Sequence, residues 1–431
     1  MSLILLRIYA WLCTLGAGWL RARLRQRALI GKEIPSRLGE RRGYDQTRRP
    51  KTPVIWLHAA SVGETLSILP VIEILLHRRT DLTVLVTTGT VTSATLLTQR
   101  ARAFDSGRRV LHRYVPLDVP RWTNRFVEHW RPDAAGFVES EIWPNLLLSC
   151  RHYGVPLMLI NARLSDASAH RWHRMRLVAQ RLFGLFAVVQ AQSDTDAERL
   201  IALGAHNVSS PGNLKFATPA LPVDHAELAR LQHLLAGRPV WLAASTHPGE
   251  ERIAGAVHLA LAERFPGLLT IIVPRHPERG PDIATDLAVT GAPVEITRRA
   301  HHEDPPAAGI WVADTLGELG LFYRLAPIAF VGRSLTVGGG QNPIEPARLG
   351  CAICTGPLTS NFEEPVRILQ TAGALTVVQD AGDLAKFVSA MLQEPERRAA
   401  MGQAGISAAT GYAGLPDLVA DTLIDLMGED R

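Results

Sequence analysis

The sequence predicts an α/β protein of two domains, each built on a doubly wound parallel sheet. From residue 54 on, apolar runs alternate with helical patterns, which is typical of βα units. A chain of 431 residues with 47% hydrophobic and 20% charged residues is a folded protein too long for one core. A proline-broken segment, 215–223, separates two series of strands and places the domain boundary near residue 217.

Each series consists of short apolar runs that we expect to be buried strands. The first comprises residues 54–58, 82–87, 134–139, 156–161 and 187–192. The second comprises residues 239–244, 268–274, 310–313, 328–332, 351–355 and 374–378. Open parallel sheets bind their ligands at the carboxyl ends of the strands, so we expect the functional residues there, in a cleft between the two domains.

The net charge of +5 comes from the N-terminal tail. Residues 1–50 hold eleven Lys or Arg against three acidic residues, which leaves 35 basic and 38 acidic residues in 51–431. A basic tail indicates contact with an anionic membrane surface, because nucleic-acid binding would need a basic face on the folded body. We therefore expect no nucleic-acid partner.

Residues 1–20 are apolar except for Ser2, Arg7 and Thr14, and an arginine cluster, Arg21 to Arg27, follows them. A cleaved signal peptide would carry its charges first. A membrane span is just long enough, and the arginine cluster would keep the body cytoplasmic. A helix lying in the interface, with Trp11 and Trp19 at headgroup level, is equally open. A helix packed on the protein itself is the alternative to anchoring.

The cysteine and histidine residues predict neither a disulfide framework nor a metal site. Cys351 and Cys354 form a C-x-x-C motif inside an apolar run that we interpret as a buried strand. The fifteen His are scattered without ligand spacing. We expect no metal and no cofactor.

The segment His58-Ala-Ala-Ser-Val-Gly-Glu-Thr65 follows the first predicted strand. Ser61 and Glu64 fit a capping box, which alone would explain both residues. A ligand would find room beside Ala60 and Gly63, and a carboxylate at the end of a strand suits a general base. The sequence leaves both interpretations open.

Three further segments of the first half end strands or follow them. In Glu139-Ser-Glu-Ile-Trp-Pro-Asn145, two acids must find partners or solvent, and one of them can cap the next helix. Asn161-Ala-Arg-Leu-Ser-Asp166 predicts a turn held by its Asn and Asp side chains. Lys215 is one of only four Lys, which indicates either a required compact charge or a surface accident.

The second half carries segments suited to bind anions. Residues 244–251 and 273–279 both follow strands, and Arg275 can make bidentate phosphate contacts. Residues 314–319 and 338–346 each combine Gly with a predicted helix start. The first start is Thr315 to Glu318, and the second is Asn342 with Pro343 at the first helical position. Free amides at such starts bind phosphate, so the set suits a nucleotide. Neither G-x-G-x-x-G nor a P-loop motif is present.

Seven of these motifs occur in the order found in one enzyme family, and they span nearly the whole chain. They are residues 60–64, 139–145, 161–165, 212–216, 245–247, 273–279 and 342–346. On these motifs and its apolar tail, the sequence resembles the bacterial 3-deoxy-D-manno-octulosonic acid (Kdo) transferases of lipopolysaccharide biosynthesis.

The resemblance implies a GT-B glycosyltransferase fold, with two Rossmann-like domains facing a central cleft. It implies an anchor helix at residues 1–30, an acceptor domain at 31–217, a CMP-sugar domain at 218–410 and a C-terminal helix at 411–431, which we expect to pack on the N-terminal domain. The implied reaction inverts the anomeric centre, with CMP-Kdo as donor and the lipid A precursor lipid IV-A as acceptor. The implied place is the cytoplasmic side of the inner membrane, on its phospholipid surface.

By matching motifs, Glu64 corresponds to the family's catalytic base, and Glu139 and Lys215 correspond to its transition-state stabilisers. The implied CMP contacts are Pro274, Arg275, Leu316, Gly317, Glu318, Asn342, Pro343, Ile344 and Glu345. The chain departs from the family pattern at Gln341, where His is common, and at Arg333, where Gly is common. The alternatives are a transferase that uses a UDP-sugar, a nucleotide-sugar 2-epimerase, and a non-catalytic membrane adaptor.

Overall fold

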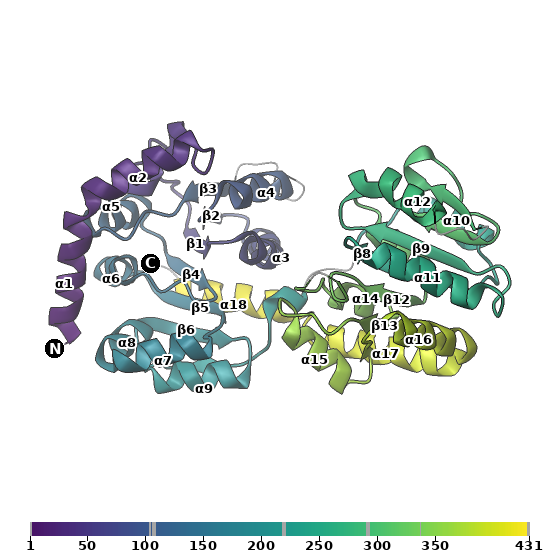
Figure 1. Cartoon of the computed structure of the whole chain (residues 1–431). Coiled ribbons are helices and arrows are strands. Elements are labelled where there is room, and N and C mark those ends of the chain that lie inside the picture. The colour runs from purple at the N-terminus through teal and green to yellow at the C-terminus, as the bar shows by residue number, and fades with distance from the viewer. Residues whose placement is uncertain are drawn as a thin grey trace. The chain divides into compact units, whose positions relative to one another are not determined.

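The computed structural model describes residues 2–102, 105, 109–217, 221–289, 294–336 and 338–428. The chain forms two compact units (Figure 1). Unit 1 comprises Met1–Thr218 and Tyr412–Arg431, and unit 2 comprises Pro219–Gly411. The last segment of the chain therefore belongs to the same unit as the first.

Unit 1 contains a parallel sheet covered by helices on both faces. Its strands are β1 (Val54–Ala59), β2 (Thr83–Thr88), β3 (Val110–Tyr114), β4 (Ala134–Val138), β5 (Leu157–Ala162), β6 (Phe186–Ala191) and β7 (Val208–Ser209). Its helices are α1 (Ser2–Leu15), α2 (Ala17–Leu29), η1 (Pro35–Arg37), η2 (Glu40–Arg42), α3 (Val62–Arg78), α4 (Val91–Ala101), α5 (Pro120–Trp130), α6 (Pro144–His152), α7 (Asp166–Arg174), α8 (Arg176–Phe183), α9 (Asp194–Ala202), η3 (Leu214–Ala217) and α18 (Leu415–Met427).

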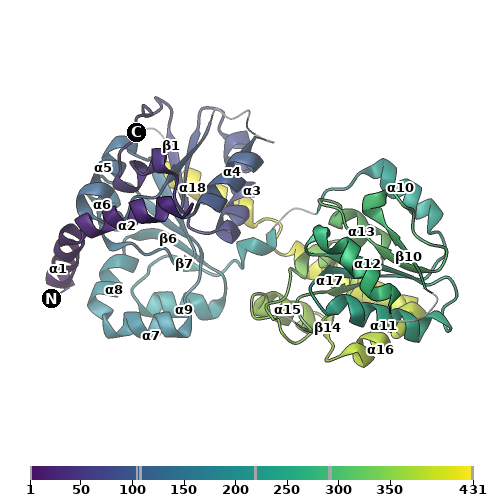
Figure 2. The ribbon, with the colours of Figure 1, turned by 45° about the horizontal axis from the view of Figure 1, so that its top comes forward.

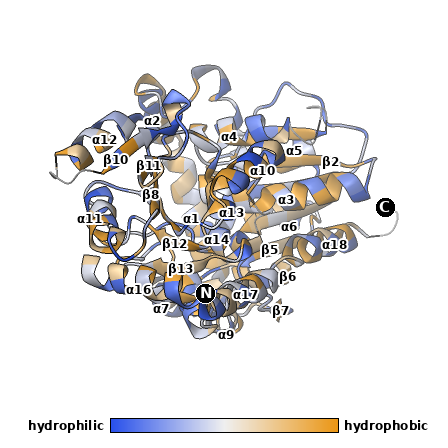
Figure 3. Ribbon diagram, turned by 90° about the vertical axis from the view of Figure 1, so that its right-hand side faces the viewer, coloured by the Kyte–Doolittle hydropathy of each residue, from blue (hydrophilic) through white to orange (hydrophobic). Residues whose placement is uncertain are grey.

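The strands of unit 1 run in the order β3-β2-β1-β4-β5-β6-β7. Successive side chains of a strand point to opposite faces, so Trp56 and Phe137 join the core under α5 and α6, whereas Ile55 and Leu57 join the core under α3. Both faces are buried, as in parallel sheets generally. In Figure 3 the strands are mostly orange, and the helices that cover them carry blue segments.

The C-terminal helix α18 belongs to the core of unit 1. Leu415, Val419 and Leu423 are buried in the cluster that also holds α3. On the rim, Arg78 of α3 pairs with Asp417 at 2.5 Å. The end of the chain thereby covers one face of the N-terminal sheet, as Figure 1 shows by the yellow helix in that unit.

Unit 2 repeats the architecture. Its strands are β8 (Val240–Thr246), β9 (Leu269–Pro274), β10 (Glu295–Arg298), β11 (Gly309–Val312), β12 (Ile328–Val331), β13 (Ala352–Thr355) and β14 (Leu375–Val377), in the order β10-β11-β9-β8-β12-β13-β14. Its helices are α10 (His225–Leu234), α11 (Glu250–Ala262), η4 (Pro277–Arg279), α12 (Gly280–Ala288), η5 (Arg299–His301), α13 (Leu319–Leu325), α14 (Ile344–Arg348), α15 (Glu363–Thr371), α16 (Ala381–Gln393) and α17 (Pro395–Thr410).

The predicted strands are present to within about two residues at each end. The sequence missed β3, β7 and β10, which lie at the edges of the two sheets. An edge strand is half exposed, so its residues are not a continuous apolar run. In β3 only Tyr114 is buried, and in β10 no residue is. The predicted structural role of Cys351 and Cys354 is consistent with their burial at the start of β13 and within it.

The N-terminal helices lie along the flank of unit 1, next to α5 and α8 (Figure 2). Leu6, Ala17 and Leu24 are buried against the unit, whereas Trp11 and Trp19 are 61% and 64% exposed. In the described part of the chain no single helix has the length and apolarity to span a membrane; α1 and α2 meet these criteria only together, with a bend of 54° between them. The tail thus packs on the protein with one face and leaves an apolar face outside.

Asp118 joins the N-terminal helix to the Glu139–Asn145 segment. Its carboxylate accepts hydrogen bonds from the backbone N–H of Asn145 (3.1 Å) and Leu146 (2.9 Å) at the start of α6. It also accepts one from the hydroxyl of Tyr9 in α1 at 2.9 Å. The N-terminal residue of α6 has no side-chain cap of its own, so Asp118 satisfies the free amides that every helix start presents. The prediction that an acid of the segment itself caps this helix is therefore wrong.

We expect Asp118→Ala to lower the free energy of unfolding by about 2 kcal/mol, because two buried amides and a tyrosine hydroxyl lose their acceptor. Tyr9→Phe removes only the bond to α1 and should cost about 1 kcal/mol. Urea unfolding followed by circular dichroism measures both. Equal losses in the two variants would contradict the capping role.

Candidate active site

The carboxyl ends of β1 and β4 bring the predicted catalytic residues of unit 1 together. The two strands are neighbours in the sheet, with His58 opposite Phe137. Glu64 lies in the first turn of α3, which follows β1, and Glu139 directly follows β4. In this sheet the strand order reverses between β1 and β4, which is where open α/β sheets place their ligands.

Glu64 is buried, at 6% exposure, and each oxygen of its carboxylate accepts one hydrogen bond. Ser61 is the N-cap of α3 and accepts a hydrogen bond from the Glu64 backbone N–H at 3.3 Å. The carboxylate accepts bonds from the Ala60 N–H at 2.7 Å and from the Ser61 hydroxyl at 2.6 Å. The predicted cap is confirmed, with the difference that the carboxylate binds the amide one residue before the N-cap. The acid is held in one orientation.

The surroundings of Glu64 raise the pKa of its carboxyl group above the ordinary glutamate value. Burial is the main cause, and the negative charges of Glu139 and Glu141 add to it. The hydrogen bonds from Ser61 and Ala60 act in the opposite direction. A carboxylate that binds a proton more tightly is a stronger base once ionised, which suits proton abstraction.

Glu139 and Lys215 form an ion pair between the ends of two segments. The Lys215 ammonium contacts Oε1 of Glu139. A methyl group added at Gly63 would lie 3.8 Å from Cε of Lys215, so the lysine chain runs along the start of α3. Lys215 is not a surface accident, since it pairs with Glu139 and its chain passes Gly63 at the start of α3.

Asn161 fixes the segment that carries Lys215. Its side-chain oxygen accepts a bond from the Leu214 N–H at 2.8 Å. Gln192 donates to the Asn161 carbonyl at 3.0 Å and accepts from Asn213 at 3.1 Å. The predicted turn held by Asn161 and Asp166 is wrong, because Asp166 pairs with Arg199 and Asn161 reaches across to the next segment. Two residues distant in sequence meet here, and no local spacing signals it.

A second network, around the buried His58, was not assigned from the sequence. His58 is fully buried, and its Nε2 lies 3.5 Å from the carboxylate of Glu141. The indole N–H of Trp143 donates to the same carboxylate at 2.6 Å. Burial raises the pKa of Glu141, but the bonds to His58 and Trp143 outweigh it and hold the pKa below the usual value. Glu141 therefore stays ionised and holds Trp143 beside the site.

Backbone strain is concentrated at the carboxyl ends of the strands. Positive φ angles occur at Glu139 (59°), Asn161 (54°), Ser245 (54°) and Arg333 (59°). For residues other than glycine this conformation costs on the order of 1–3 kcal/mol and persists where the surrounding structure enforces it, often at functional sites. Both units carry the feature at the positions that the motifs mark.

In unit 2, Glu250 ties together the segments that follow β8 and β12. One oxygen of its buried carboxylate accepts bonds from the N–H groups of His247 (2.9 Å) and Arg333 (2.7 Å). The other accepts from Ser334 (2.8 Å) and Leu335 (3.0 Å). Gly332 has no room for a side chain, because a Cβ would lie 2.8 Å from this carboxylate. Glu250, in the first turn of α11, thus uses its carboxylate to bind the backbone of neighbouring segments, and the predicted anion-binding role of residues 244–251 stays a prediction.

The predicted CMP contacts lie on three segments of unit 2. Pro274 is buried at the end of β9, and the next residue, Arg275, is exposed. Burial raises the pKa of Glu345, whereas a bond to Asn342 and the charge of Arg275 lower it. Pro343 and Ile344 are buried in the same segment, beside Asn342. Arg275 and Asn342 therefore both lie close enough to Glu345 to interact with its carboxyl group.

The predicted helix start at Thr315 is wrong, because helix α13 begins at Leu319. The predicted start at Pro343 is found to within one residue: α14 begins at Ile344, and Asn342 accepts a hydrogen bond from the Ile344 N–H at 3.1 Å. Both helices are short, at seven and five residues. The Glu318 side chain is bound by Arg299 at 2.8 Å, whereas Leu316 is 82% exposed and Gly317 has a φ of 83°. These loops offer exposed backbone and polar side chains rather than strong helix dipoles.

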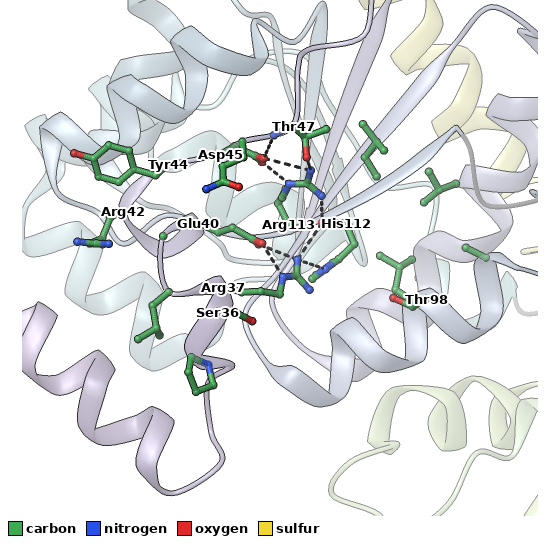
Figure 4. A pocket seen from close by; sticks show the side chains of 18 of the residues that line it. Ser36, Arg37, Glu40, Arg42, Tyr44, Asp45, Thr47, Thr98, His112 and Arg113 are labelled. Carbon is green, nitrogen blue, oxygen red and sulfur yellow. Dashed lines mark hydrogen bonds and ion pairs between the residues drawn. The ribbon is translucent and has the colours of Figure 1, made fainter.

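A large hollow of about 1270 Å³ lies in unit 1 at the edge strand β3, and none of the predicted site residues lines it (Figure 4). Its charges are paired within the wall: Arg37 with Glu40 at 2.7 Å, and Arg113 with Asp45. Burial, together with three nearby arginines, lowers the pKa of His112 to about 3. Glu40 also accepts the Tyr114 N–H at 2.7 Å, so the segment covers the open edge of the sheet. These ion pairs are therefore explained by a structural role, the covering of the edge strand β3.

Within the described ranges, no group of three or more His, Cys, Asp or Glu side chains is placed to hold a metal ion. His301, which precedes His302 in the sequence, lies 3.9 Å from the carboxylate of Glu303.

Comparison with known proteins places this site in a family. Residues 36–218 match the model for 3-deoxy-D-manno-octulosonic-acid transferase (kdotransferase). The 3-deoxy-D-manno-octulosonic acid transferase of Haemophilus influenzae is 35% identical over 378 residues, which cover 86% of each chain. The chain belongs to the 3-deoxy-D-manno-octulosonic acid transferase family. The enzyme of Bordetella pertussis is also 35% identical, over 91% of this chain and 92% of its own.

Members of this family are glycosyltransferases, and this Kdo transferase acts in lipopolysaccharide biosynthesis. Its fold is shared more widely. A glycosyltransferase from Rickettsia africae matches with a TM-score of 0.56 at 10% identity, over 88% of this chain and 100% of that one. The UDP-GlcNAc 2-epimerase of Neisseria meningitidis matches with a TM-score of 0.58 at 15% identity, over 86% of this chain and 100% of its own. The predicted α/β fold of the GT-B type is thereby confirmed.

We expect Glu250→Gln to lower the free energy of unfolding by about 3 kcal/mol, because the amide NH₂ must face two backbone N–H groups. Glu263→Gln, on the exposed end of the same helix, should change it by less than about 0.5 kcal/mol. Denaturant unfolding monitored by tryptophan fluorescence compares them. A Glu250 variant as stable as the Glu263 variant would refute the anchoring role.

Proposed function

We propose that this Kdo transferase moves Kdo from CMP-Kdo to lipid IV-A with inversion at the anomeric carbon. The observation that carries the proposal is the grouping of a buried carboxylate, Glu64, with the Glu139–Lys215 ion pair at neighbouring strand ends. The group supplies one base and one cation. The central cleft between the domains stays a prediction.

Glu64 is the proposed general base. It removes the proton from the acceptor hydroxyl while that oxygen attacks the anomeric carbon of Kdo, on the face opposite the leaving CMP. Its elevated pKa and its fixed orientation both favour this role. The bonds from Ala60 and Ser61 keep the carboxylate in place before the acceptor arrives.

Lys215 is the proposed stabiliser of negative charge in the transition state, and Glu139 orients it. The sequence left open whether Glu139 acts on the sugar ring or on the lysine. The ion pair between them favours orientation, since a lysine chain has four rotatable bonds and needs a partner to hold one position.

Unit 2 is the proposed donor domain. Arg275 would meet the phosphate of CMP, for which a guanidinium is well suited. Asn342 and Glu345 lie within its electrostatic reach, and the exposed backbone around Leu316 and Gly317 would contact the nucleotide. Pro274, Glu318, Pro343 and Ile344 would shape these loops. The side chain of Glu318, bound to Arg299, leaves its backbone as the group for a ligand.

We further propose that α1 and α2 attach the enzyme to the cytoplasmic side of the inner membrane. The outer face of these helices exposes Ile4, Trp11, Leu15 and Trp19 at 60%, 61%, 61% and 64%. Exposed arginines of α2 border this face and suit anionic phospholipid headgroups. Such a helix would lie in the interface and bring the site to an acceptor whose acyl chains stay in the bilayer.

The decisive assay offers CMP-Kdo or UDP-sugars with lipid IV-A to the purified enzyme. We expect turnover with CMP-Kdo only, and Glu64→Gln should reduce kcat by about 10²-fold to 10⁴-fold. The amide can still accept the Ala60 N–H, so the variant should keep its melting temperature. A Glu64→Gln enzyme that retains most of its turnover would reduce Glu64 to a helix cap.

The pH dependence of kcat gives a second test. Because Glu64 must be ionised, kcat should fall as the pH drops through a pKa above the ordinary glutamate value. Removing the negative charge in Glu141→Gln favours the ionised base, so this acid limb should move to lower pH. The control Glu73→Gln changes an exposed acid of α3 and should leave the limb in place. An unmoved or upward-shifted limb in Glu141→Gln would count against the assignment of Glu64.

A further inference from the structure

Unit 1 contains an apolar pocket of about 280 Å³ between α2 and the carboxyl ends of β1 and β2. Leu20 and Leu24 of α2 form one wall, and Val115, Leu117 and Trp143 contribute the others. Ala60 also lines it, and the Ala60 N–H is the group that binds the Glu64 carboxylate at 2.7 Å. The pocket therefore runs from the exposed N-terminal helices to the immediate neighbourhood of the proposed base.

The polar residues of this wall bind one another and leave its aliphatic surface to a ligand. Arg41 and Glu33 form a buried pair at 3.1 Å, and Arg41 also donates to the Gly89 carbonyl at 2.6 Å. The Glu141 carboxylate is bound by Trp143 and lies against His58. An apolar ligand can therefore lie on the aliphatic surface while Arg41, Glu33 and Glu141 keep their partners.

We propose that this pocket binds the first part of an acyl chain of the lipid acceptor. Two arguments select this occupant, and both rest on the proposed function. The lining includes Leu20 and Leu24 of α2, one of the helices that we propose lie against the membrane, so a lipid would enter from there. The lining also includes Arg23 and Arg27, cations that complement the phosphates of an anionic lipid.

The test uses water-soluble analogues of lipid IV-A, one without acyl chains and others with short chains, below the concentration at which they form micelles. With the wild-type enzyme, kcat/KM should rise about fourfold for each methylene that enters the pocket and then level off. Leu20→Trp and Leu117→Trp, which fill the pocket from two segments, should remove most of this rise. The control Ile201→Trp lies on α9, where its side chain is 57% exposed, and should retain it.

A wild-type enzyme indifferent to chain length would overturn the acyl site, as would equal losses in Ile201→Trp and Leu20→Trp. If the acyl-free analogue and the chain-bearing ones all fail to accept Kdo, the acceptor class itself is wrong. The two failures are therefore distinguishable.

An independent feature of unit 2 concerns Arg333, which follows β12. Its backbone has a φ of 59°, a conformation that glycine adopts without strain. Among the described residues, the buried Nε of its guanidinium has no hydrogen-bond partner. A strained residue whose buried N–H lacks a partner calls for a functional explanation.

The position of Arg333 supplies a functional explanation. Its N–H is held by Glu250 at 2.7 Å, and its carbonyl accepts the Gly340 N–H at 2.8 Å. A Cβ added at Gly339 would lie 3.3 Å from its Nε, so the side chain runs along the glycine segment that leads to Asn342. We infer that Arg333 is a specificity-determining residue that binds an anionic group of the donor, either the CMP phosphate or the Kdo carboxylate.

Calorimetric titration of CMP and of CMP-Kdo tests this inference without turnover. Arg333→Gly should weaken donor binding about tenfold, yet raise the thermal midpoint because the strain is relieved. Arg333→Ala should weaken binding equally without that gain in stability. Loss for both ligands identifies the phosphate as the contact, and loss for CMP-Kdo alone identifies the carboxylate.

Unchanged affinity for both ligands in Arg333→Gly would refute the inference. Failure of the wild-type protein to bind either CMP or CMP-Kdo would instead refute the proposed donor.

Discussion

The site of unit 1 depends on one constraint of topology, the pairing of β1 with β4. These strands are separated by β2, β3 and three helices in the sequence, yet they lie side by side in the sheet. A parallel sheet aligns the carboxyl ends of its strands at one edge, so the segment after β1 and the segment after β4 must meet. Glu64 and Glu139 come together for this reason.

Hydrogen bonds between segments then set the orientation of the charges. Asn161 and Gln192, at the ends of β5 and β6, hold the segment of Lys215 so that its ammonium reaches Glu139. In unit 2, the carboxylate of Glu250 performs the corresponding task for the segments that follow β8 and β12. Hydrogen-bond networks of this kind between segments fix a single arrangement of loops.

The N-terminal helices connect the fold to the membrane role that we propose. Asp118 binds both Tyr9 of α1 and the start of α6, which follows the Glu139–Trp143 segment. The helices therefore rest on the same part of the sheet that carries the acids. An apolar pocket beside Ala60 extends from α2 toward Glu64, so the lipid-facing surface and the chemistry occupy one side of unit 1.

The sequence by itself determined the buried strands, the helix start at Ser61 and the motifs at the strand ends, because apolar runs and caps are local signals. It did not determine the edge strands β3 and β10, whose exposed faces break the apolar pattern. It misplaced the start of α13, where the chain turns before the helix begins. Only the tertiary structure decided that Lys215 meets Glu139, that Asp118 caps α6, and that Glu250 holds Arg333 in a strained backbone. Each of these contacts joins residues far apart in the sequence, and long-range contacts are fixed by the order of strands rather than by local spacing.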